Sequence, residues 1–479
     1  MKPVLTCHND YRSFLRDGIH QYYPNTCAIS KETWAVYKQF RDLDLSKVDL
    51  LLQDKYSVYG PKPRQPSCMF RSLLLAPKFK VTSVTSWVHQ MQITPMYALL
   101  SGFSPDDVPG VGTFYDFMSR LWDHTADNYS DHIKPVPCKV RKPKGRGKKA
   151  DPVEKETVAD LITRLTNTHF ELDDEAYKTL FRVFSECFLS QSILNGVIHP
   201  DDIRLSGDGT PVVTSQRMRS HHTCDCHSNG IFNCSCDRYF SQPDCDIGWD
   251  SSRDKFYFGY DMYVLTDTKN DLPLFPLLHP ASKHDSHSFC ESFFRFRSFL
   301  SNLHISQLLL DSAHDSMAMY QFCQREKITP FIDLNLGNSK KSSDYHGVTL
   351  GPDGIPICAK GLKMTSNGND LKRQYAKFRC PLMKGTSCSC DSPCSSAKYG
   401  RTCSIPLASN IRLYCTPPRD SDEWKSVYNS RTASERSNKR QKIDYLLEAG
   451  KHHSTKFWYI RVYIICMLQH LDAWPVLDS

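Results

Sequence analysis

A succession of strand and helix patterns in the middle of this chain limits its fold most tightly. The stretch around Asp208 and the residues from 256 to 266 place apolar side chains at about every second position, as half-buried strands do. A third strand follows these two, and then two more strands, each preceded by a helical pattern. The order is β-β-β-α-β-α-β, which predicts a mixed sheet flanked by helices. The elements are expected at Ile203–Thr214, Phe256–Thr266, Leu272–Leu278, Ser286–Asn302, Ile305–Leu310, Asp315–Arg325 and Thr329–Leu334.

Two aspartates occupy the first and fourth of these strands. Asp208 lies between Gly207 and Gly209, which would let the backbone and a metal ion approach closely. Asp311 directly follows three leucines at the end of the fourth strand. Taken alone, Asp208 could be a turn residue and Asp311 a helix N-cap. Asp315 is the better cap candidate because it opens the next helix, so Asp311 is the expected metal ligand, although an exchange of these two roles remains open.

A helix near the C-terminus carries a third acid. At about 100° per residue, Tyr428, Arg431, Glu435 and Lys442 fall within about 60° of one another around the helix axis. One carboxylate is then placed among two cations and a phenol. A solvated helix face with ordinary charge pairs is the alternative explanation. A carboxylate that binds a metal beside cations that bind phosphate would suit phosphoryl transfer.

The spacing Tyr-x2-Arg-x3-Glu-x6-Lys resembles the helix signature of bacterial insertion-sequence transposases of the DDE type. The resemblance extends from the N-terminal helices to Trp474. It implies an RNase H-like catalytic core in which Asp208, Asp311 and Glu435 bind two Mg²⁺ or Mn²⁺ ions. It also implies metal-dependent DNA strand cleavage and strand transfer by a homodimer that binds double-stranded DNA, both at the terminal inverted repeats and at the target. Tyr428, Arg431 and Lys442 would bind the DNA.

The expected organisation has three parts. Residues 1–135 form an all-helical N-terminal DNA-binding domain, with helices at Lys31–Phe40, Pro66–Leu75, Val81–Leu100 and Gly112–Trp122. Residues 136–153 form a basic linker, and residues 154–479 form the catalytic domain with insertions at about 215–253 and 336–423. The net charge of +8 is concentrated in the linker, where cations favour contact with DNA phosphates. The cations expected to bind DNA are Lys139, Arg141, Lys142, Arg146 and Lys148.

Both insertions are rich in cysteine. The chain has 20 cysteines and lacks a recognisable export signal, so reduced thiols or metal binding are expected rather than disulfides. Clustered thiolates could hold Zn²⁺ in at least one insertion. Free buried thiols or a disordered insertion are the alternatives. The candidate zinc ligands are Cys224, Cys226, Cys234 and Cys236 in the first insertion and Cys380, Cys388, Cys390 and Cys394 in the second.

Two other classes of protein remain open at this stage. One is a catalytically inactive or domesticated DNA-binding protein that contains zinc, and the other is a zinc-dependent structural or regulatory module. The three acids argue against an inactive copy, since such a copy need not keep them. No membrane contact is expected, because the longest apolar stretch, near residues 457–468, is short and contains Arg461. The expected location is the bacterial cytoplasm, in association with the nucleoid.

Overall fold

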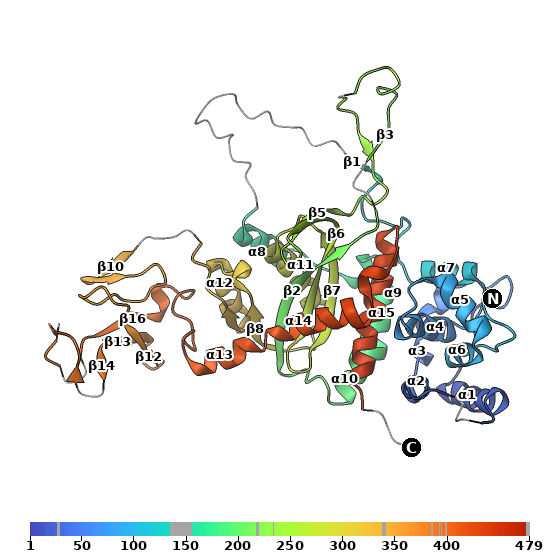
Figure 1. Ribbon diagram of the computed structural model, residues 1–479, viewed down its shortest axis with the longest axis horizontal. Helices are drawn as coiled ribbons and strands as arrows, with labels where there is room; N and C mark the ends of the chain where they lie inside the picture. The colour runs from blue at the N-terminus through green and yellow to red at the C-terminus, as the bar shows by residue number, and fades with distance from the viewer. Residues whose placement is uncertain are drawn as a thin grey trace.

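A six-stranded mixed sheet lies between a helical N-terminal region and a group of small β-sheets (Figure 1). The computed structural model describes residues 1–25, 29–134, 156–216, 220–232, 234–337, 342–384, 387–391, 393, 395–397 and 400–475. The strands of the main sheet follow the order β5-β6-β2-β8-β9, and β7 also pairs with β6. They are β2 (Ile203–Val213), β5 (Asp246–Asp250), β6 (Lys255–Asp267), β7 (Leu272–Pro280), β8 (Ile305–Leu310) and β9 (Thr329–Ile332).

The central strand of this sheet is β2. It pairs antiparallel with β6 and parallel with β8, and β8 pairs parallel with β9. The strands and helices expected between residues 203 and 334 are therefore confirmed, including α11 (Asp285–Phe299) and α12 (Met317–Glu326). Strand β5 was not expected. It lies within residues 215–253, for which the sequence predicted an insertion, and its two buried positions are Gly248 and Asp250, so it lacks an inward apolar pattern.

Helices cover both faces of the sheet. Tyr263 of β6 packs edge-on against Phe289 of α11, with 6.2 Å between the ring centroids. On the other face, Ser434 of α14 (Thr432–Lys439) donates a hydrogen bond of 2.6 Å to Ser206 of β2. Because successive strand residues point to opposite faces, Ser206 and Asp208 share the face that α14 covers.

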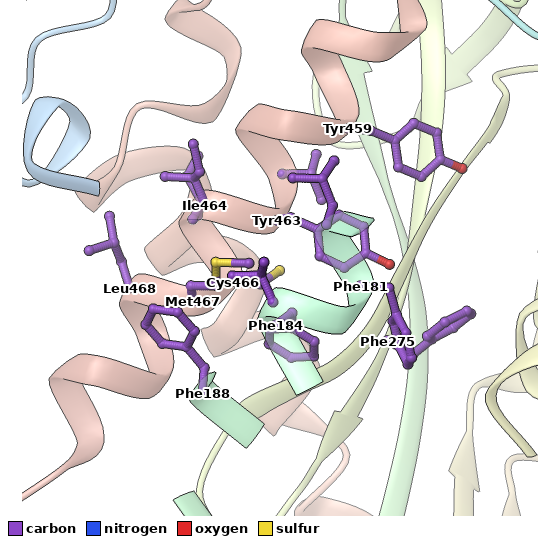
Figure 2. Packing of buried hydrophobic residues seen from close by; sticks show 14 of the residues in the cluster. Phe181, Phe184, Phe188, Phe275, Tyr459, Tyr463, Ile464, Cys466, Met467 and Leu468 are labelled. Atoms are coloured by element: carbon purple, nitrogen blue, oxygen red, sulfur yellow. The ribbon is translucent and has the colours of Figure 1, made fainter. Parts of the chain in front are cut away.

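The C-terminal helix α15 (Thr455–Ala473) joins the sheet to the N-terminal region. The Tyr459 hydroxyl accepts a hydrogen bond of 3.3 Å from the Leu278 amide of β7, while Phe184 and Phe188 pack from the helical segment that follows α9 (Lys178–Val183) (Figure 2). The buried side chains form one continuous core from the N-terminal helices to the sheet. Among the described residues, no helix has both the length and the apolar character needed to cross a bilayer.

Seven helices make up the described N-terminal region. The expected helices near residues 31–40, 66–75 and 112–122 are confirmed. The pattern from Val81 to Leu100 forms two helices rather than one, because Pro95 starts a new helix at its first position. The helices are α1 (His8–Tyr22), α2 (Lys31–Asp42), α3 (Ser46–Leu52), α4 (Pro66–Lys78), α5 (Val84–Ile93), α6 (Pro95–Ser101) and α7 (Val111–Arg120).

Two groups of short strands extend from the main sheet (Figure 1). The first is a three-stranded sheet of β1 (Ile133–Lys134), β4 (Arg238–Tyr239) and β3 (His221–His222). The second has strands within residues 342–406 and its own small core, which includes Leu350, Phe378, Ile405 and also Tyr414 beyond the last strand. Its strands are β10 (Ser343–Tyr345), β11 (Val348–Leu350), β12 (Thr365–Asp370), β13 (Tyr375–Arg379), β14 (Met383–Lys384), β15 (Ser387–Cys388) and β16 (Thr402–Pro406).

A buried histidine in α15 makes the fold sensitive to acid. His470 donates from Nε2 to the Pro273 carbonyl at 2.8 Å and accepts at Nδ1 from Ser192, also at 2.8 Å. Burial lowers its pKa from 6.5 to about 4. The imidazole of the unfolded chain therefore takes up a proton below about pH 6.5, and that of the folded chain only below about pH 4. The free energy of unfolding falls as the pH drops through this window, by up to about 1.4 kcal/mol per pH unit.

The substitution His470→Gln removes the titratable imidazole. The unfolding free energy is then expected to depend less steeply on pH between about 6.5 and 4. Urea denaturation at several pH values measures the slope. His20→Gln, at an exposed position of α1, is the matched control and should keep the slope of the wild type. Equal slopes in the wild type and His470→Gln would contradict the assignment.

Candidate functional site

The three acids predicted from the sequence come from three elements that meet on one side of the sheet. Ser206 of β2 lies opposite Leu309 of β8, so Asp208 lies level with Asp311, the residue that directly follows β8. Helix α14 contacts β2 on the same face. Its Asn438 donates a hydrogen bond of 2.9 Å to Asp208, and Glu435 lies one turn earlier on the helix.

Asp208 is partly buried, and its surroundings oppose a negative charge. Burial, together with the nearby charges of Asp311 and Glu435, raises its pKa to about 7, and Arg431 only partly opposes this shift. A carboxyl group in such a position favours a bound proton or a bound cation. The Asp208 carboxyl therefore holds a proton more readily than that of a free aspartate.

Asp311 is held in place through one of its two oxygens. Its Oδ1 accepts hydrogen bonds from the Ala313 amide at 3.0 Å and from His314 Nδ1 at 2.6 Å. With Nδ1 as the donor, His314 Nε2 accepts from the buried Tyr263 hydroxyl at 2.9 Å. Burial alone would raise the pKa of Asp311, but the hydrogen bonds from His314 and the Ala313 amide, together with the nearby Arg431 charge, lower the pKa. Within the described part of the chain, Oδ2 of Asp311 receives no hydrogen bond and remains open to a ligand.

Asp315 does not cap the following helix, so that prediction was wrong. Ser316 is the N-cap of α12, whereas Asp311 caps the short 3₁₀ turn Ser312–His314 with its side chain. The Asp315 side chain is fully buried and forms two hydrogen bonds with Arg412, at 2.9 and 2.7 Å. Asp311 therefore combines a capping role with an open oxygen, and Asp315 has a structural role.

Arg431 lies between an aromatic ring and the third acid. Its Nη2 lies 2.7 Å from Glu435 Oε1, and its Cζ lies 5.8 Å from the centroid of the Tyr428 ring. Tyr428 in turn stacks on Trp424, with 4.5 Å between the ring centroids. The Glu435 side chain keeps 54% of its surface exposed, and that of Arg431 keeps 18%. Glu435 is thus accessible, and Arg431 is held in a fixed orientation.

The predicted single helix is interrupted, and Lys442 pairs with Glu448 instead of with the other three residues. The chain forms α13 (Asp422–Asn429), α14 and a π-helical turn at Arg440–Asp444. The Tyr445 amide donates to the Arg440 carbonyl at 3.1 Å, five residues back, and this wider turn changes the angular phase of the residues that it contains. Lys442 Nζ lies 3.6 Å from Glu448. The structure brings together Tyr428, Arg431 and Glu435, but not Lys442.

Gly207 and Gly209 also have a different role from the one expected. They point away from α14, toward the face covered by α11. A Cβ atom at residue 207 would lie 2.5 Å from the Tyr263 hydroxyl, and one at residue 209 would lie 2.7 Å from Asp261 Oδ1. The glycines therefore make room for side chains of β6, not for a metal ion beside Asp208.

A second candidate site lies in the first cysteine-rich segment. The sulfur atoms of Cys224, Cys226, Cys234 and Cys236 all lie within 4.8 Å of one another and could hold a zinc ion. Hydrogen bonds with Cys226 lower the pKa of the Cys224 thiol, whereas hydrogen bonds with Cys224 raise the pKa of Cys226 and of Cys236. In the part of the chain that the structure describes, no other three metal-ligating side chains are this close, so the oxygens of Asp208, Asp311 and Glu435 are more widely spaced.

The remaining predicted ligands and contacts are only partly described. Cys380 is buried and Cys390 half-buried, and neither belongs to a metal-ligating group of described residues. The side chain of Cys388 and the whole of Cys394 lie outside the described residues, as do the linker cations Lys139, Arg141, Lys142, Arg146 and Lys148. No family model, no curated protein and no solved structure matches this chain.

Proposed function

We propose that this protein is a DNA transposase of the DDE type that cleaves and joins DNA strands at the terminal inverted repeats of an insertion sequence. One observation carries the proposal: Asp208 of β2 lies level with Asp311, which directly follows the adjacent parallel strand β8, and Glu435 belongs to a helix packed on the same face. The strand order β7-β6-β2-β8-β9 supports the proposal further, because an RNase H-like core would have its first strand at the centre and its acids in these positions.

The acids fit a divalent metal chemically. All three offer oxygen atoms, which Mg²⁺ and Mn²⁺ prefer as ligands, and the charges of Asp311 and Glu435 near Asp208 would attract a cation. Asp208, the open oxygen of Asp311 and Glu435 would hold the ions. When bound, a pair of such ions would activate an attacking oxygen and stabilise the leaving oxygen of a phosphodiester.

The chain's own side chains would orient these ligands and the DNA. Asn438 orients Asp208 by a hydrogen bond. His314 orients Asp311 by a hydrogen bond to Oδ1, which leaves Oδ2 open. Arg431 would bind a phosphate oxygen next to the scissile bond, since its guanidinium is already ordered beside Glu435. Tyr428 would contribute a contact to the sugar-phosphate backbone or to a base.

The test is cleavage of a labelled duplex that carries the inverted repeat flanking the gene. With Mg²⁺ or Mn²⁺ we expect strand cleavage followed by joining to target DNA, and we expect a chelator to abolish both steps while duplex binding persists. Duplex binding without cleavage in either metal would contradict the proposal. That result would favour the second candidate, a catalytically inactive zinc-containing DNA-binding protein, which the four-cysteine group supports.

A further inference from the structure

We propose that Cys224, Cys226, Cys234 and Cys236 bind one structural zinc ion that folds the cysteine arm, the name used below for residues 220–232 and 234–240. The arm projects away from the main sheet near β3 (Figure 1). This site is separate from the three acids, and it does not depend on the proposed transposase activity.

The distances between the sulfur atoms carry the proposal. Cys224 Sγ lies 3.7 Å from Cys234 Sγ, and Cys226 Sγ lies 3.8 Å from Cys236 Sγ. Zinc–sulfur bonds of about 2.3 Å in a tetrahedron place neighbouring sulfur atoms about 3.8 Å apart. A disulfide would place them about 2 Å apart. The four sulfur atoms are therefore spaced as the corners of a tetrathiolate site.

A tight turn brings the two Cys-x-Cys pairs together. The amides of Asn229 and Ile231 both donate to the Cys226 carbonyl, at 3.1 and 2.8 Å. Gly230 has a φ of +76°, a left-handed conformation that glycine adopts without strain. The chain reverses at this turn, so that Cys234 and Cys236 return beside the first pair. The backbone therefore positions all four ligands from one short segment, as in structural zinc sites.

The tip of the arm buries little apolar surface. Ile231 and Phe232 keep 55% and 66% of their surface accessible. Strands β3 and β4 contain only two residues each. A segment that buries so little apolar surface needs a cross-link to hold one conformation, and zinc binding supplies folding free energy in such modules.

Cationic and imidazole groups surround the thiolates. Arg238 Nη2 lies 3.9 Å from Cys234 Sγ and contacts His222, whose Nδ1 lies 3.7 Å from the same sulfur. Four thiolates around Zn²⁺ carry a net charge of about −2, which a neighbouring guanidinium would partly neutralise. Arg238 also lies in β4, which pairs with β1, so the zinc ion would hold the arm against Ile133 and Lys134.

The first experiment measures zinc in the full-length protein after purification under reducing conditions. We expect one zinc ion per chain by elemental analysis, and a tetrathiolate absorption spectrum after replacement with cobalt. The double variant Cys224→Ser/Cys236→Ser should lose the metal. Cys7→Ser is the matched control, because Cys7 is exposed at the N-cap of α1, where serine is also favourable, and this variant should keep one zinc.

Limited trypsin digestion provides a second measurement that does not rely on a variant. Zinc removal by a chelator should expose the bond after Arg238 to cleavage and leave the main sheet protected. Three results would each overturn the proposal. They are absence of zinc from the wild type after reconstitution, retention of zinc by the double variant, and disulfides among the four cysteines. Glu435→Gln should retain zinc, so failure of the transposase proposal can be told apart from failure of this one.

Discussion

The substitution Glu435→Gln is expected to lower the rate of strand cleavage and strand joining by at least about 1,000-fold, with duplex binding unchanged. Glutamine keeps the shape of the side chain but removes the charge that would bind a metal. Glu435 is half exposed and its partner is Arg431, so the fold should lose little stability. Single-turnover cleavage of the labelled repeat, with binding measured separately by a mobility shift, checks both parts of the prediction.

Glu423→Gln is the matched control for this substitution. Glu423 is exposed in the first turn of α13, two turns before the Arg431–Glu435 pair, and none of the three acids contacts it. This variant should cleave at the rate of the wild type. Full activity of Glu435→Gln would remove Glu435 from the catalytic set, and equal loss in both variants would point to a general effect of charge on this surface.

Local patterns in the sequence predicted the centre of the fold correctly. The apolar residues of β6 and the leucines before Asp311 predicted both strands. The expected half-burial of β6 was wrong, because helices cover both faces of the sheet and residues 259–267 are all buried. The predicted order of elements then placed Asp208 and Asp311 on adjacent strands, and the structure brings them level. This part of the candidate site could be predicted because the order of the strands and helices determines which strands are neighbours in the sheet.

Other features depend on contacts between distant residues, which no local pattern reveals. The π-helical turn that redirects Lys442 has the same composition as an ordinary helix. Strand β5 forms because β6 extends beyond β7 and offers a free edge, although β5 has no inward apolar residues. The pairing of Asp315 with Arg412 joins residues 97 positions apart. The spacing of the cysteines alone also did not indicate which of the two cysteine-rich segments is the better candidate for zinc.

The neighbouring acids Asp311 and Asp315 should show opposite effects when each is changed to asparagine. In Asp311→Asn the amide oxygen can still accept from Ala313 and His314, so the free energy of unfolding should stay within about 1 kcal/mol of the wild type. The open oxygen becomes an NH₂ group that cannot bind a cation. Cleavage should therefore fall by at least about 1,000-fold.

Asp315→Asn should instead destabilise the protein and spare the reaction. Its buried carboxylate balances the Arg412 guanidinium and accepts from the Asn335 amide at 2.6 Å. Loss of one partner of a buried ion pair costs about 3 kcal/mol, whereas cleavage per folded molecule should stay within a few-fold of the wild type. Urea denaturation and single-turnover cleavage, measured on both variants, separate the two roles. The prediction depends on Asp311 having an oxygen that is free for a metal, whereas both oxygens of Asp315 are already bonded. The reverse pattern would therefore mean that Asp315 is the ligand and Asp311 only a cap.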